Sequence, residues 1–283
     1  MSDISTPLVA FQGAPGAYSE LACRNACPEM KPLPVNTFED TFSAVADGSA
    51  DLAMIPIENS VAGRVADIHR ILPESGLFIV GEYFQRVNHQ LLAPKGAHLE
   101  SLQEVHSHVQ ALSQCRAFIL RQGLTQCVHG DTAGAARDVA EAGDKHRSAI
   151  ASELAAEIYG LEVLATDIED AGHNTTRFLM MAREQGIPPL DQVPVMTTFV
   201  FRVRNVPAAL YKALGGFASN GVNMLKLESY MLGGSFSATQ FYSDIEGHPE
   251  QDAVKRSMEE LAFFTEFIKI LGVYPLHPFR NDR

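Results

Sequence analysis

Four polar clusters before residue 180 contain residue types that could do chemistry. The first is the glycine-rich stretch 13–20, which includes Ser19. It lacks the third glycine of a dinucleotide fingerprint. Because the free N–H groups at the start of a helix attract anions, the stretch could instead hold a carboxylate, with the Ser19 hydroxyl beside it. Ordinary helix capping is the alternative interpretation.

The second cluster consists of Glu58, Asn59 and Ser60, directly after the apolar run 52–57. This run is predicted to be a buried strand, and polar groups at the end of such a strand are typical of functional sites in α/β proteins. The alternative is that Asn59 or Ser60 caps a helix beginning near Gly63.

The third cluster, residues 107–115, enters a helix and offers Ser107 and Gln110. These residues could bind a ligand together with the helix N–H groups. Alternatively, Ser107 is only a cap and Gln110 lies on the surface.

The fourth cluster, residues 172–178, contains Asn174, Thr176 and Arg177 before an apolar strand. An arginine beside hydroxyl and amide groups is typical of a carboxylate clamp. A solvent-exposed arginine is the alternative.

The cysteines and histidines do not predict a metal site. Four cysteines, at positions 23, 27, 115 and 127, fit no zinc spacing and are interpreted as small apolar core residues. His106 and His108 could flank a metal, but the sequence shows no third ligand. We therefore expect no metal.

The elements that must position these clusters follow an α/β pattern. Short apolar strands such as 8–11, 52–57 and 176–182 alternate with helical patterns such as 16–26 and 38–46. Ser101 and Glu104 could open a short helix as a capping box. We expect two lobes, roughly 1–85 with 170–184 and 86–169, and therefore a cleft that could bind a small ligand.

A second domain is predicted after the proline-containing linker 186–194. Strands at 195–203, 222–231, 236–245 and 267–273 and helices at 207–220 and 249–263 give the order βαββαβ. This order is the ferredoxin-like arrangement.

The composition limits the possible partners. The formal charge of −12 and the scattered basic residues argue against nucleic acid. No apolar run approaches the roughly 20 residues needed to cross a bilayer, and the polar start 1–7 has no signal-peptide character. We expect a cytoplasmic protein that does not bind membranes.

The four clusters, in this order, resemble the prephenate dehydratase family, including its threonine-arginine-phenylalanine signature at Thr176, Arg177 and Phe178. The resemblance spans nearly the whole chain. It departs at Val109, where the family usually has proline. It implies a two-lobed catalytic domain at 1–184, similar to type II periplasmic binding proteins, and an ACT regulatory domain at 195–283.

The activity implied by the resemblance is decarboxylating dehydration of prephenate to phenylpyruvate, in L-phenylalanine biosynthesis, without a metal or organic cofactor. Thr176 is expected to hydrogen-bond the departing hydroxyl, and Arg177 the pyruvyl carboxylate. Glu58 or a water could supply the proton. The other expected substrate-binding residues are Ser19, Asn59, Ser60, Ser107, Gln110, Asn174 and Phe178.

The implied effector is L-phenylalanine, acting as a feedback inhibitor. Two family motifs are half changed: glycine-alanine-leucine-valine stands here as residues 208–211, and glutamate-serine-arginine-proline as residues 228–231. A purely dimer-forming domain is the alternative, and a homodimer or homotetramer is expected either way. The expected effector-binding residues are Ala208, Ala209, Leu210, Asn220, Gly221, Asn223, Glu228 and Ser229.

Three other functions compete with this interpretation. A solute-binding module would share the two-lobed fold. Arogenate dehydratase would use the same chemistry on a substrate with an amino group in place of the keto oxygen. A non-catalytic amino-acid sensor would keep the fold alone, although Asn174, Thr176 and Arg177 argue against it.

Overall fold

The computed structural model describes residues 6–191, 194–204, 206–231 and 238–281. The chain forms two compact units, residues 1–65 with 83–178 and residues 66–82 with 179–283. Strands β5 (Phe78–Arg86) and β11 (Thr175–Ala182) contribute residues to both units. The α/β class predicted from the sequence is confirmed. The predicted domain limits 1–184 and 195–283 stay a prediction.

The first unit begins with a parallel arrangement of short strands. β1 (Leu8–Gln12) pairs with β2 (Lys31–Val35) on one side and with β3 (Leu52–Asn59) on the other. β4 (Gly63–Arg64) pairs antiparallel with the end of β3. Two helices, α1 (Tyr18–Ala26) and α2 (Phe38–Ala46), connect the strands.

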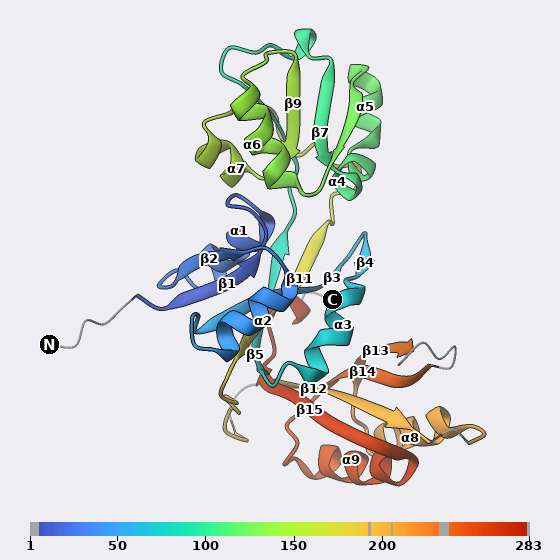
Figure 1. Cartoon of the computed structure of the whole chain (residues 1–283). Helices are drawn as coiled ribbons and strands as arrows, with labels where there is room; N and C mark the ends of the chain where they lie inside the picture. Colours follow the sequence, from blue (N-terminus) through green and yellow to red (C-terminus); the bar gives the residue numbers. More distant parts are fainter. Residues whose placement is uncertain (1–5, 192–193, 205, 232–237, 282–283) are drawn as a thin grey trace, which may run out of the picture. The chain divides into compact units, whose positions relative to one another are not determined.

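The second sheet of this unit has the strand order β10-β6-β9-β7-β8. Helices α4 and α5 cover one face and helices α6 and α7 cover the other (Figure 1). Its strands are β6 (Gln90–Ala93), β7 (Glu104–His108), β8 (Thr125–His129), β9 (Arg147–Ala151) and β10 (Glu162–Ala165); its helices are α4 (Val109–Gln114), α5 (Arg116–Gln122), α6 (Thr132–Ala142) and α7 (Glu153–Tyr159).

The glycine-rich loop before α1 packs against α7. A Cβ atom on Gly16 would lie 2.8 Å from Ala155 Cα, and the φ of Gly16 is +88°, so this position requires glycine. Ser152 Oγ donates to Gly16 O at 2.6 Å, and Tyr159 OH donates to Pro15 O at 2.7 Å. The loop therefore joins the two sheets of the first unit.

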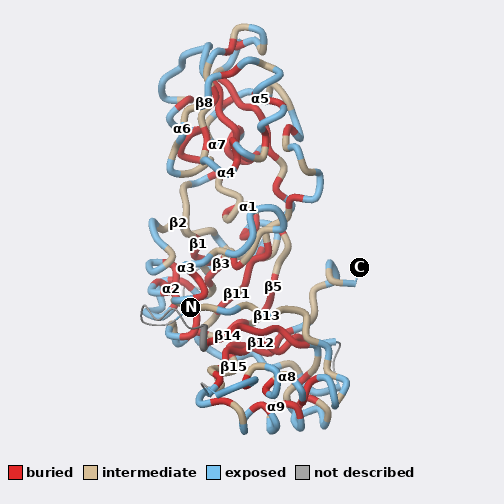
Figure 2. The backbone as a smooth tube through the Cα atoms, turned by 90° about the vertical axis from the view of Figure 1, so that its right-hand side faces the viewer, coloured by how far each residue is buried: buried red, intermediate tan, exposed pale blue. Residues whose placement is uncertain are grey.

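The C-terminal part of the second unit has the predicted βαββαβ order. The strand order β13-β14-β12-β15 is that of a ferredoxin-like sheet. Helices α8 and α9 pack on it through a shared apolar core, and Figure 2 shows β12 and β14 largely buried. The elements are β12 (Val195–Val203), α8 (Ala209–Ser219), β13 (Met224–Met231), β14 (Ala238–Glu246), α9 (Asp252–Phe264) and β15 (Thr265–Pro275). Residues 236–237 of the predicted third strand lie outside the described residues.

The remaining elements of the chain are short. They are α3 (Ala66–Ile71) and the 3₁₀ segments Leu72–Glu74, Leu99–Ser101 and Pro278–Asn281. The capping box predicted at Ser101 and Glu104 is wrong, because Glu104 begins strand β7. Among the described residues, no helix has both the length and the apolar character needed to span a membrane.

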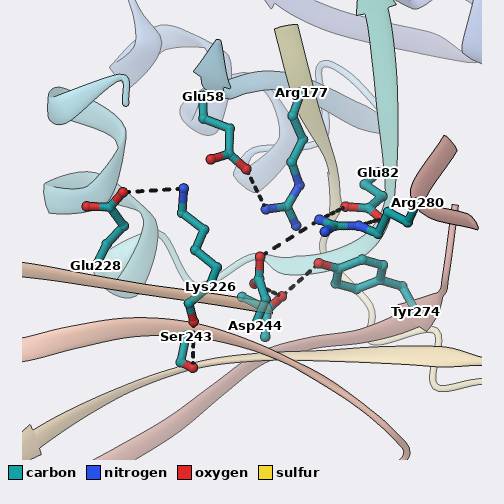
Figure 3. Close-up of polar contacts among 10 residues, drawn as sticks. Glu58, Glu82, Arg177, Lys226, Glu228, Ser243, Asp244, Tyr274 and Arg280 are labelled. Atoms are coloured by element: carbon teal, nitrogen blue, oxygen red, sulfur yellow. Dashed lines mark hydrogen bonds and ion pairs between the residues drawn. The ribbon is translucent and has the colours of Figure 1, made fainter. Parts of the chain in front are cut away.

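A buried ionic cluster lies inside the second unit (Figure 3). Arg280 donates to both oxygens of Glu82, at 2.6 and 2.8 Å, and lies 4.0 Å from Asp244 Oδ2. The side chains of Glu82 and Asp244 are fully buried, and that of Arg280 is 6% exposed. Thr198 Oγ1 donates to Asp244 Oδ1 at 2.7 Å. The cluster keeps two buried carboxylates paired.

Candidate active site

Thr176 lies at the centre of a hydrogen-bonded cluster formed where β3 ends and β11 begins. Asn59 Nδ2 donates to Thr176 Oγ1 at 2.9 Å and to Asn174 Oδ1 at 2.8 Å. Asn59 Oδ1 in turn accepts from the backbone N–H groups of Val61 and Ala62. These backbone bonds fix the orientation of the Asn59 amide, which directs an N–H group at the Thr176 oxygen.

Gln114, the last residue of α4, extends this cluster to a helix that packs on the second sheet. Its Oε1 atom accepts from Asn174 Nδ2 at 3.0 Å and lies 2.8 Å from His89 Nε2. An amide oxygen can only accept, so His89 Nε2 carries the proton. Gln114 therefore links the strand-end amides to a buried imidazole.

His89 is held at its other ring nitrogen by Tyr18. Tyr18 OH lies 2.9 Å from His89 Nδ1 and 2.7 Å from Asn88 O. Burial lowers the pKa of His89, against the Gln114 bond and the Glu169 carboxylate, which raise it. Burial raises the pKa of Tyr18, so its hydroxyl stays protonated. At neutral pH the imidazole of His89 is therefore neutral, with its proton on Nε2.

Arg177 lies in a different environment from Thr176, its neighbour in sequence. Successive residues of a strand point to opposite faces, so Arg177 and Glu58 lie on the face opposite Thr176 and Asn59. Arg177 Nη1 donates to Glu58 Oε1 at 3.0 Å, and the Arg177 side chain is only 2% exposed (Figure 3). Arg177, the predicted carboxylate clamp, thus pairs with Glu58 on the face opposite the Thr176 hydroxyl.

Two predicted serines hold the backbone of the site. Ser60 Oγ donates to His173 O at 2.7 Å and accepts from Thr175 N at 2.9 Å, so it ties the end of β3 to β11. Ser107 is fully buried and donates to Ile150 O at 2.6 Å. In this arrangement both hydroxyls serve the scaffold.

The other predicted substrate-binding residues lie apart from this hydrogen-bonded chain. Gln110 is exposed in the first turn of α4, where its N–H donates to His108 Nδ1. Phe178 is 1% exposed and belongs to the core. Ser19 is half-buried on α1. In the loop before it, the Gly16 N–H already donates to the Glu20 carboxylate, at 2.7 Å.

Three residues of this hydrogen-bonded chain of side chains were not predicted from the sequence: Gln114, His89 and Tyr18. Gln114 lies in the same stretch as Gln110, one helical turn further on, so an amide facing inward from α4 could have been found by testing both positions. His89 directly precedes the short strand β6, and Tyr18 begins α1. Their partners are distant in sequence, which hides them from local patterns.

The predicted effector residues occupy the turns around α8 and the strand β13. Ala208 precedes α8 with φ +60°, in the left-handed region. Asn220 is the C-cap of α8 and donates to Gly216 O and Glu260 Oε1, while Asn223 donates to Glu246 Oε2. Glu228 lies 3.5 Å from Lys226 Nζ. Ala209 and Leu210 open α8, Gly221 follows it, and Ser229 lies on β13.

The arrangement around Thr176 fits hydrogen-bond donation to a small polar ligand. Because Asn59 donates to Thr176 Oγ1, the Thr176 proton must point away from that amide. A hydroxyl oriented in this way can stabilise negative charge as it develops on a leaving oxygen. Such a donor at a strand end of an α/β protein suits the chemistry of a lyase, which must help a group to leave its substrate.

Comparison with known proteins identifies the family. The family model for prephenate dehydratase matches residues 9–186. A bifunctional N-acyl-homoserine lactone acylase/prephenate dehydratase of Komagataeibacter europaeus is 56% identical over 97% of this chain and 98% of its own length. The chloroplastic arogenate dehydratase/prephenate dehydratase 2 of Arabidopsis thaliana is 39% identical over 98% of this chain and 74% of its own. The chain belongs to the prephenate dehydratase family.

A solved structure agrees with this assignment. The prephenate dehydratase of Arthrobacter aurescens, crystallised in complex with L-Phe, superposes with a TM-score of 0.86 at 29% identity, covering 95% of this chain and 90% of its own.

Proposed function

We propose that this chain removes water and carbon dioxide from prephenate to give phenylpyruvate, with Thr176 as the residue that assists departure of the hydroxyl. Family membership supports the reaction. The observation that supports the role of Thr176 is the 2.9 Å bond from Asn59 Nδ2 to its hydroxyl oxygen. Because Thr176 Oγ1 accepts this bond, the hydroxyl proton points away from Asn59.

Loss of carbon dioxide and hydroxide restores aromaticity in the ring, so the product is strongly favoured. The difficult part is the leaving hydroxide, and assistance by a positioned acid typically accelerates such a step about 10²- to 10⁴-fold. A neutral alcohol is too weak an acid to give up its proton fully. Thr176 therefore stabilises the developing charge by a hydrogen bond. The proposed proton source is a water, because Glu58 pairs with Arg177 on the opposite face of the strands.

The test is an assay of the purified chain with prephenate, following phenylpyruvate by its absorbance in alkali. Thr176→Ala is expected to lower turnover at least about 100-fold, within the range of a lost positioned acid. Thr176→Ser keeps a hydroxyl and serves as the matched control, with most of the activity retained. Equal turnover by wild type and Thr176→Ala would refute the role of Thr176.

L-Phenylalanine is the proposed effector, bound by the C-terminal ferredoxin-like domain, for which the ACT family is the proposed relative. The relative from Arthrobacter aurescens, whose structure contains L-Phe, supports this proposal. Isothermal titration with L-phenylalanine, beside a prephenate assay, tests it. Absence of both heat and inhibition at millimolar ligand would refute it.

We further propose a homodimer or homotetramer that functions in the cytoplasm. Large apolar side chains are exposed on the second unit, including Tyr211 at 81% and Phe263 at 73% exposure, and a second copy could cover them. The four free cysteines suit a reducing compartment. Light scattering coupled to size exclusion measures the oligomeric state.

Arogenate is a second candidate substrate, because the Arabidopsis relative is named for both activities. The two substrates differ only where an amino group replaces the keto oxygen. Steady-state assays with each substrate decide between them through the ratio of the two kcat/KM values.

Acyl-homoserine lactone hydrolysis is a further candidate activity, suggested by the name of the relative that is 56% identical. It is tested by incubating the chain with an N-acyl-homoserine lactone and measuring release of homoserine lactone by mass spectrometry. Thr176→Ala in the same assay shows whether the two activities share a site. Absence of release from the wild type would remove this candidate.

A further inference from the structure

Strands β7 and β8 carry two matching patterns of polar residues, Glu104 and His106 on the first, Cys127 and His129 on the second. The strands run parallel, and His106 is directly opposite Cys127. Because alternate residues of a strand share a face, all four side chains extend from the same face of the sheet. That face is the one on which α6 packs.

The donor atoms of three of these residues are already close together. One carboxylate oxygen of Glu104, an imidazole nitrogen of His106 and the Cys127 sulfur all lie within 4.8 Å of one another. In a tetrahedral zinc site, donor atoms lie about 3.3 to 3.7 Å apart. A contraction of about 1 Å, through side-chain rotation, would complete such a site.

His129 and Asp138 fix the orientation of the His106 ring. Its Nδ1 atom lies 2.9 Å from His129 Nε2, and His129 Nδ1 lies 3.5 Å from Asp138 Oδ2 on helix α6. The other ring nitrogen, Nε2, points to Glu104 Oε2 at 3.2 Å. Metal-binding imidazoles usually show this pattern, in which the second nitrogen bonds to a partner that fixes the ring.

We propose that Glu104, His106 and Cys127 bind one Zn²⁺ ion, with His129 and Asp138 orienting His106. A thiolate, an imidazole and a carboxylate are the donors that zinc takes in proteins. Calcium and magnesium prefer sets made of oxygen atoms. β8 is the edge strand of its sheet, so a bound ion would fasten this edge to β7.

The side chain of Arg147 must move before a zinc ion can bind to Glu104. Arg147 Nε lies 3.1 Å from Glu104 Oε2 and 3.7 Å from Asp144 Oδ2. The Arg147 side chain is 44% exposed, so it can turn toward Asp144 and leave Glu104 to the metal. The arginine and the ion thus compete for one carboxylate, and zinc is expected to displace it.

The test uses the full chain after washing with a chelator. Competition with a chromogenic zinc chelator measures affinity, and elemental analysis measures stoichiometry, with one ion per chain expected. Cys127→Ser is expected to weaken binding more than about 100-fold, and His129→Gln about 10- to 100-fold, as for a lost supporting residue. His98→Gln, an exposed histidine elsewhere on the same unit, is the control with unchanged affinity.

A measurement on the unmutated protein tests the proposal even if the variants fail to fold. Zinc is expected to slow alkylation of Cys127 by iodoacetamide, followed by mass spectrometry, and cobalt is expected to give a thiolate charge-transfer band. Alkylation of Cys127 at the same rate with and without zinc would overturn the proposal. Binding by Cys127→Ser as tight as that of the wild type would overturn it as well. Neither readout depends on dehydratase activity.

Discussion

Asn59 Nδ2 lies 2.9 Å from Thr176 Oγ1, although the two residues are 117 positions apart in the sequence. The bond joins the end of one strand to the beginning of another, and the Asn59 amide is itself held by backbone N–H groups. The hydroxyl is therefore positioned by a partner that cannot easily rotate.

The first prediction concerns this partner. Asn59→Ala should lower kcat by up to about 100-fold, because a small misplacement of a catalytic group has an effect of that size. KM should change less. Asn25→Ala, which removes an amide on α1 bonded to Gln85, is the control. An Asn59→Ala enzyme with wild-type kcat would show that Thr176 needs no orientation by this amide.

The second prediction concerns pH and His89. Burial lowers the folded-state pKa of His89 below the usual histidine value of about 6.5. The unfolded chain therefore binds the extra proton more readily, and stability is complete above about pH 6.5 but falls as the pH drops through the folded pKa. Thermal unfolding at pH 7.5 and pH 5 measures this loss. It should be smaller in His89→Gln than in the wild type.

Other histidines contribute to the same pH range. Burial also lowers the pKa values of His106 and His277, so the comparison rests on the difference between the wild type and His89→Gln. Identical pH dependence in the two proteins would mean that His89 is not buried as a neutral group.

The third prediction separates two roles for Arg177. If its main partner is Glu58, then Arg177→Met should lower the free energy of unfolding by about 1.5 to 3 kcal/mol, the usual contribution of a hydrogen bond to a charged group. Denaturant titration measures this. If Arg177 grips the substrate instead, KM should rise while stability hardly changes. Glu58→Gln should destabilise in the first case and leave KM unchanged.

The fourth prediction concerns the buried cluster around Arg280. Arg280→Met would remove the cation that pairs with buried Glu82 and lies 4.0 Å from buried Asp244, and removing one partner of a buried pair typically costs about 3 to 5 kcal/mol. Thermal denaturation should show a large loss of stability. Arg204→Met, at an exposed position, should have little effect. A similar melting temperature for both variants would contradict this interpretation.

Much of the fold could be predicted because its signals are local. The apolar run 52–57 is part of the buried strand β3, and the βαββαβ order after residue 194 follows from successive patterns of period two and period 3.6. β2 was less easily predicted, because Pro32 and Pro34 argue against a strand. It lies at the edge of its sheet, where prolines are tolerated.

The site could be predicted only in part. Asn59 and Asn174 lie just outside predicted strands and Thr176 begins one, and the structure places the three side chains together. The separation of Thr176 from Arg177 follows from strand alternation, but the sequence does not reveal which face the ligand uses. The cysteine spacing fits no zinc pattern and therefore favours a core role for Cys127. Linear spacing does not show that His106 lies opposite Cys127 on the neighbouring strand.

The hydrogen-bonded chain from Tyr18 to Thr176 also bears on synthesis of the protein. Its members come from α1, β3, α4, β11 and the segment between β5 and β6, so a nascent chain lacks a working site until β11 has left the ribosome. Contacts between such distant residues form slowly, because the intervening loops must close first. Recovery of activity on refolding should therefore lag behind recovery of helical signal.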